Sequence, residues 1–179
     1  MFGASFYTSD TTGNRPKRDM EGIEARVYIA DLHLRYHYGP FRMAALGMMG
    51  WLDNADKVTE KNSSLSKYLE VPRTAVASSV YAYYLESSLD LIELINPEIR
   101  HRFDLFFRYD GYDTMWEAPQ DGSGFDNPLL QRQVITTGFN YFPHPRVVIK
   151  GEYLSRWINK DDNWGRHQHE VNCSLGFVL

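Results

Sequence analysis

Apolar and polar residues alternate along much of the chain with a period of two. In residues 28–38 the even positions are apolar, whereas Asp31, His33, Arg35 and His37 stand at odd positions. The same alternation recurs in four later segments, at residues 103–110, 135–141, 147–157 and 171–179. Sustained alternation of this kind predicts β-strands that have one apolar face and one polar face.

The complete pattern predicts eight strands. Their expected positions are residues 1–8, 23–38, 41–52, 74–91, 102–112, 132–142, 146–157 and 168–179. The connections expected to be short are 39–40 and 142–145, the segment 92–101 is intermediate, and those expected to be long are 9–22, 53–73, 113–131 and 158–167. Long strands joined by short turns at one end and long polar loops at the other are typical of outer-membrane barrels. We therefore expect an all-β, antiparallel up-and-down transmembrane β-barrel in a single domain spanning residues 1–179.

Aromatic residues make up 15% of the chain, with Tyr 12, Phe 10 and Trp 4, and several gather near the ends of the predicted strands. Tyr and Trp rings favour a membrane boundary because one end of each ring is apolar and the other is polar. This distribution predicts two aromatic belts, lipid as a partner, and the outer membrane of a Gram-negative-type bacterium as the location. The expected interface residues are Tyr36, Tyr38, Phe41, Trp51, Tyr109, Tyr112, Tyr141, Phe142 and Trp157.

Composition and charge exclude several other classes. The longest stretch without Asp, Glu, Lys or Arg has 13 residues, from Gln133 to Pro145, whereas a membrane-spanning helix needs about 20 apolar residues. A single cysteine, Cys173, leaves no internal disulfide framework. The net charge of −4, without a Lys/Arg cluster, argues against a nucleic-acid partner. Met1 lies within a strand-like segment with no signal peptide before it, so we expect a truncated reading frame.

If the apolar faces contact lipid, the polar faces line a lumen. The expected lumen residues are Asp31, His33, Arg35, His37, Arg42, Glu86, Asp90, Asp104, Arg108, Asp110, Lys150, Glu152 and Arg156. Selectivity for one kind of ion requires rings or ladders of one sign, whereas these charges have mixed signs. We therefore expect most of them to pair across neighbouring strands.

No cofactor, metal or catalytic site is expected. His33 and His37 share one face of a strand but stand about 13 Å apart, too far to bind one metal ion. His167 and His169, near residues 161–163, are a better metal candidate, although a solvated loop is the simpler interpretation. Ser, His and Asp residues occur in no catalytic motif, so we do not expect an enzyme.

Several segments resemble a known family. Residues 76–86 and 106–114, and above all 137–145 followed by 147–153, are similar to strands of the phosphate-selective porin O and P family. The last segment resembles the terminal strand by which barrel-assembly machinery recognises outer-membrane proteins, with Val171, Cys173, Leu175, Phe177 and Leu179 on its apolar face. Family members usually end in an aromatic residue, whereas this chain ends in Leu179.

The resemblance implies the C-terminal half of a sixteen-stranded porin that forms a homotrimer and allows small hydrophilic solutes or ions to diffuse passively. Phosphate selectivity is not carried over, because no single-sign ladder is present. One alternative is a complete eight-stranded barrel with a filled interior, acting as an anchor, adhesin or binding protein. Another is a soluble lipocalin-like barrel, in which alternation places the apolar face inside.

Overall fold

The computed structural model describes residues 1–11, 22–66, 75–119, 130–160 and 163–177. These residues form strands with two helices between them. In chain order the elements are β1 (Phe2–Asp10), β2 (Arg26–Tyr38), β3 (Phe41–Leu52), α1 (Ala55–Ser66), β4 (Ser79–Asp90), α2 (Leu91–Ile95), β5 (Arg102–Glu117), β6 (Gln131–His144), β7 (Val147–Lys160) and β8 (Asn163–Phe177).

All eight strands form one sheet in the order β1-β2-β3-β4-β5-β6-β7-β8, and each pairs antiparallel with its neighbours in the chain. The predicted all-β, antiparallel up-and-down architecture is confirmed. Within the described residues the sheet is open, because β1 and β8 are its edges and are not paired with each other. The described strands therefore do not close into a barrel.

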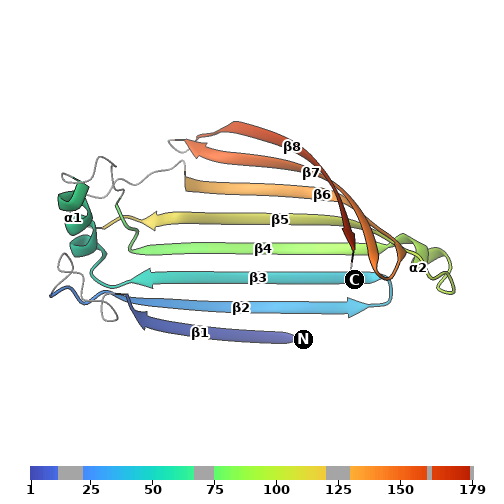
Figure 1. Cartoon of the computed structure of the whole chain (residues 1–179), viewed down its shortest axis with the longest axis horizontal. Helices are drawn as coiled ribbons and strands as arrows, with labels where there is room; N and C mark the ends of the chain where they lie inside the picture. Colours follow the sequence, from blue (N-terminus) through green and yellow to red (C-terminus); the bar gives the residue numbers. More distant parts are fainter. Residues whose placement is uncertain (12–21, 67–74, 120–129, 161–162, 178–179) are drawn as a thin grey trace.

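The two ends of the sheet differ in their connections (Figure 1). The end that carries α2, which we call the turn end, has the tight β2–β3 turn at Gly39 and the β6–β7 turn after His144. Gly39 has a φ of +51°, a left-handed conformation that glycine adopts without strain. The opposite end, which we call the loop end, carries α1. Figure 1 also shows β7 and β8 curving away from the plane of β2 to β5.

The structure corrects several details of the predicted pattern. α1 lies in the segment 53–73, which was expected to be a loop, and β4 begins at Ser79 rather than at residue 74. α2 follows β4 directly because the Asp90 side chain accepts hydrogen bonds from the backbone N–H groups of Ile92 and Glu93. The long loop expected at 158–167 is also wrong, because β7 continues to Lys160 and β8 begins at Asn163.

Alternation gives the sheet two different surfaces. One, which we call the charged face, carries the expected lumen residues, and the other, which we call the apolar face, carries large exposed side chains. Leu105 and Phe107, for example, are each 46% exposed on the apolar face of β5. Among the described residues only six hydrophobic ones are buried: Ile23, Ala25, Ala55, Met115, Val134 and Ile158. No other layer formed by the described residues thus covers the apolar face.

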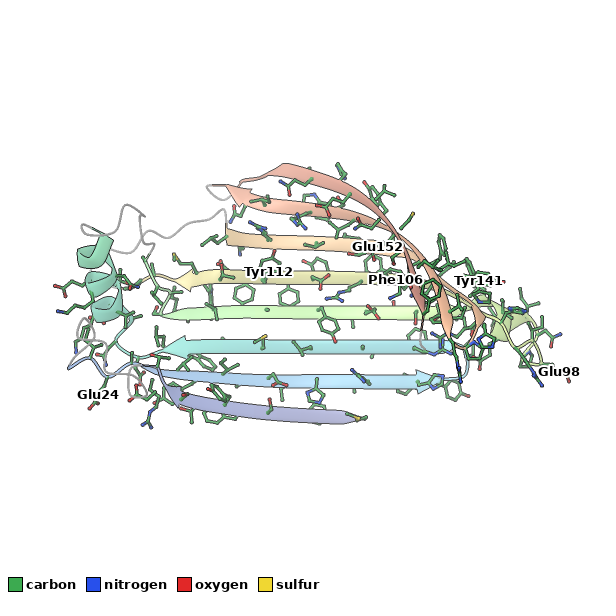
Figure 2. The ribbon with its side chains drawn as sticks, in the orientation of Figure 1. Glu24, Glu98, Phe106, Tyr112, Tyr141 and Glu152 are labelled. Atoms are coloured by element: carbon green, nitrogen blue, oxygen red, sulfur yellow. The ribbon has the colours of Figure 1, made fainter. Side chains whose placement is uncertain are left out.

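Neither helix in the described ranges is long and apolar enough to span a membrane. In Figure 2, Glu24 marks the loop end and Glu98 marks the turn end, with Tyr112 and Phe106 between them along β5.

Candidate functional site

The charged face contains an open hollow of about 1310 Å³, which is lined by residues of β2 to β7. Ten of the thirteen expected lumen residues line it: Arg35, His37, Arg42, Glu86, Asp104, Arg108, Asp110, Lys150, Glu152 and Arg156. The other three, Asp31, His33 and Asp90, occupy alternate positions of β2 and β4 on the same face. The alternation in the sequence therefore identified residues that the sheet places around one hollow.

An ionic network occupies the turn end of the hollow. Arg42 lies 3.0 Å from the Asp104 carboxylate, 3.9 Å from that of Asp90 and 3.6 Å from that of Glu93. Arg102 lies 3.0 Å from the second oxygen of Asp104. Asp90 and Asp104 are only 3% and 4% exposed, and burying a charged group is costly unless it is paired and hydrogen-bonded. Arg42 thus connects β3 with β4, α2 and β5.

A second network lies near the middle of β5. The Arg108 guanidinium is 2.6 Å from the Asp110 carboxylate and 3.9 Å from that of Glu86 on β4. It also lies 4.5 Å from the centre of the Tyr84 ring, a cation–π contact. The short Arg108–Asp110 pair thus lies within β5, and only the longer Arg108–Glu86 contact joins β5 to the neighbouring strand β4.

The two networks on β5 repeat one local pattern, Arg-aromatic-Asp. Arg102 and Asp104 form the first ion pair and Arg108 and Asp110 form the second, with both pairs on the charged face. The Arg102 guanidinium lies 3.8 Å from the centre of the Phe142 ring on β6, as Arg108 lies over a ring on β4. Sequence reasoning overlooked Arg102, although its even position on the same strand as Asp104 was sufficient to find it.

The remaining charges on this face are less constrained. Arg156 donates a hydrogen bond to Gln168 at 3.0 Å and lies 3.5 Å from the Glu170 carboxylate on β8. Glu152 accepts a hydrogen bond from Asn172 at 3.2 Å. In contrast, Arg35 and Lys150 are exposed and form no ion pair within the described parts of the chain. Arg35 and Lys150 therefore line the hollow without an oppositely charged partner among the described residues.

The structure places the histidines that the sequence offered as metal candidates in strands. His33 Nδ1 lies 3.0 Å from Asp31, which also accepts a hydrogen bond from Ser5. His169 is on β8, not in a loop, and its Nδ1 lies 2.7 Å from the Tyr153 hydroxyl. His167 packs against Trp157 with ring centres 5.7 Å apart, and residues 161–162 lie outside the described ranges. Among the described residues, no group of three or more His, Cys, Asp or Glu side chains is arranged to hold a metal ion.

The nine expected interface aromatics do not all lie on one face. Tyr36, Tyr38, Phe41 and Tyr141 lie on the apolar face at the turn end, and Trp51 and Trp157 lie on that face towards the loop end. Tyr109 is on the same face in the middle of β5, and its hydroxyl accepts a hydrogen bond from Tyr83 at 3.4 Å. Tyr112 and Phe142 are instead on the charged face, where Tyr112 lines the hollow and Phe142 contacts Arg102.

The terminal strand β8 is an edge of the sheet. Val171, Cys173, Leu175 and Phe177 alternate along it and are exposed, opposite Tyr153, Gly151, Ile149 and Val147 of β7. Leu179 lies outside the described residues. The apolar alternation expected for an assembly signal is therefore present on an accessible strand.

Comparisons with known proteins do not name a family. No family model matches the chain. An uncharacterized protein from Aquifex aeolicus (strain VF5) is 24% identical over 139 residues, which cover 76% of this chain and 30% of that protein. The chain thus spans less than a third of the length of this relative. A comparison with solved structures finds no significant match.

Proposed function

We propose that this chain forms part of the wall of an outer-membrane porin, whose water-filled lumen lets small hydrophilic solutes or ions diffuse passively. The observation that carries this proposal is the division of one sheet into a charged, hollowed face and an exposed apolar face. A soluble protein covers so extensive an apolar surface, whereas a lipid-exposed strand presents it outward. The sequence resemblance to the phosphate-selective porin O and P family supports the same function.

The open edges indicate what the assembled wall needs. Within lipid, unpaired backbone groups on β1 and β8 cost several kcal/mol each, so both edges require partner strands. We propose that further strands complete the barrel, as in a sixteen-stranded porin, and that completed barrels form trimers. The greater length of the Aquifex aeolicus relative is compatible with a barrel of more strands.

Recordings from planar lipid bilayers test the proposed function. The complete protein, purified in detergent, is expected to produce discrete conductance steps when it inserts. Stable insertion without conductance would contradict a porin and favour the filled eight-stranded barrel. A protein that stays dissolved without detergent and does not insert would contradict the membrane assignment altogether.

Reversing the two uncompensated cations is expected to change ion preference. Arg35→Glu combined with Lys150→Glu replaces two positive charges at the hollow with two negative ones. We expect the permeability of Cl⁻ relative to K⁺ to fall by about twofold or more, because local charges determine the potential in a narrow aqueous path. Reversal potentials in a KCl gradient measure this ratio.

A matched control uses two exposed arginines at the turn end. Arg100→Glu with Arg146→Glu makes the same change in net charge, but neither residue lines the hollow. This control should leave the permeability ratio close to its original value. Equal shifts in both double variants would show that Arg35 and Lys150 do not line the conduction path.

A further inference from the structure

The apolar face contains a groove of about 740 Å³ near β1 to β5. Leu32, Gly47 and Met49 lie along its floor, and a Cβ atom added at Gly47 would meet nothing within 4 Å. The groove is therefore open directly above the backbone of β3, on the surface that the proposed function turns towards lipid.

An ordered row of aromatic rings forms one wall of this groove. The Tyr81 and Tyr83 rings are nearly parallel, with centres 6.2 Å apart, and Trp116 meets Tyr81 edge-on at 5.4 Å. The β4–β5 register shifts between Ser79 and Tyr81, next to Trp116. Gln131 donates a hydrogen bond to the Tyr81 hydroxyl at 3.2 Å. These contacts fix the wall, so the groove is a shaped feature of the sheet.

A positively charged residue, Arg26, lies on the same face as the groove, at the loop end. Arg26 is exposed and alternates with Tyr28, Ala30 and Leu32 along β2, which places it on the same face. It forms no ion pair with the described residues, although the acidic residue Asp10 is opposite it in register. An anionic group bound at this position would contact the Arg26 side chain, on the same face as the apolar groove.

The spacing matches the dimensions of a membrane lipid. Leu32 is six positions after Arg26, which is about 20 Å of extended strand and, at a barrel tilt of about 45°, corresponds to about 14 Å of depth. One leaflet of a hydrocarbon core is about 15 Å deep, half of about 30 Å. A lipid whose headgroup contacts Arg26 therefore has an acyl chain long enough to reach the groove lined by Tyr81 and Tyr83.

We propose that this groove is a binding site for one acyl chain of an anionic phospholipid in the loop-end leaflet, with Arg26 contacting the negatively charged headgroup. The site rests on the proposed function, because it requires the apolar face to contact lipid. It adds a discrete lipid site to a surface that otherwise contacts lipid without preference. Trp51 and Trp116 both line the groove and provide a signal for its occupancy.

Quenching by brominated lipids tests the site in the complete protein reconstituted into phosphatidylcholine vesicles. Trp157→Phe and Trp164→Phe remove the other two of the four tryptophans of this chain, and tryptophans elsewhere in the complete protein are replaced in the same way. Brominated phosphatidylglycerol should half-quench the emission at a mole fraction about fivefold lower than brominated phosphatidylcholine, the preference that one interfacial arginine provides for an anionic lipid. Arg26→Gln should abolish this preference, whereas Asp10→Asn should keep or increase it.

Filling the groove gives a second, independent test. Gly47→Leu should also abolish the headgroup preference, whereas Ala45→Leu, beside the groove on the same face of β3, should preserve it. Equal quenching by both lipids in the unsubstituted groove, or an unchanged preference in Gly47→Leu, would overturn the site. Binding of a second copy of the chain in the groove would also overturn the site. It would be seen as a protein mass in detergent that halves in Gly47→Leu. Failure of the proposed function looks different, since neither brominated lipid would then quench at all.

Discussion

Replacing Arg42 with glutamine is expected to lower the free energy of unfolding by about 3 kcal/mol. This is the low end of the cost of breaking a buried ion pair, chosen because Arg42 itself is partly exposed. The change leaves Asp90 and Asp104, both nearly inaccessible, without their shared cation. Arg102 still contacts Asp104, but no described cation other than Arg42 contacts Asp90.

The effect is measured by urea unfolding of the vesicle-reconstituted protein, followed by tryptophan fluorescence. Arg35→Gln is the matched control, because Arg35 lies on the same face but is exposed and forms no described ion pair. It should change the free energy of unfolding by less than about 0.5 kcal/mol. If both glutamine variants unfold alike, the ionic network at the turn end does not stabilise the sheet.

Replacing Gly138 with alanine is expected to cost about 2–3 kcal/mol, the upper part of the range for overpacking. A Cβ atom at this position would lie 2.2 Å from the carbonyl oxygen of Gly151 and 2.8 Å from the Cα of Glu152. Both contacts are with backbone, so no side-chain rotation relieves them, and β6 must separate from β7. The ladder there pairs Gly138 with Glu152.

Gly47→Ala is the control for this substitution. Gly47 is also within a strand, but an added Cβ there meets nothing within 4 Å. We expect a change near zero or a slight stabilisation, since alanine has less conformational freedom to lose on folding. Equal unfolding of Gly138→Ala and Gly47→Ala would show that the β6–β7 spacing is not as close as described.

Most of the sheet was predictable because alternation is a direct consequence of strand geometry. The segment 41–52 was predicted with the bounds that β3 has. α1 was missed because its sequence, ADKVTEKNSSLS, is mostly polar and contains only three apolar residues, too few to mark an amphipathic helix. Residues 158–160 of β7 and 163–167 of β8, at the loop end, were missed because charged and amide residues there interrupt the alternation.

The composition of the charged face was predictable, but the contacts within it were not. Alternation assigns a residue to a face, whereas its partner depends on the register between strands, which loops and turns determine. Arg42 and Asp104 are 62 positions apart in the sequence, and nothing local indicates that they meet. Tyr112 and Phe142 were assigned to the membrane interface from their position near strand ends. That position alone did not reveal on which face they lie.

In the proposed barrel wall, the charged face borders water and the apolar face borders lipid. Single cysteines placed in a Cys173→Ser background and reconstituted into vesicles test it through their reaction with a charged, membrane-impermeant thiol reagent. Arg35→Cys and Lys150→Cys are predicted to react, while Leu105→Cys and Phe107→Cys are predicted to react only after detergent is added. Rapid reaction at Leu105→Cys and Phe107→Cys in intact vesicles would contradict this account.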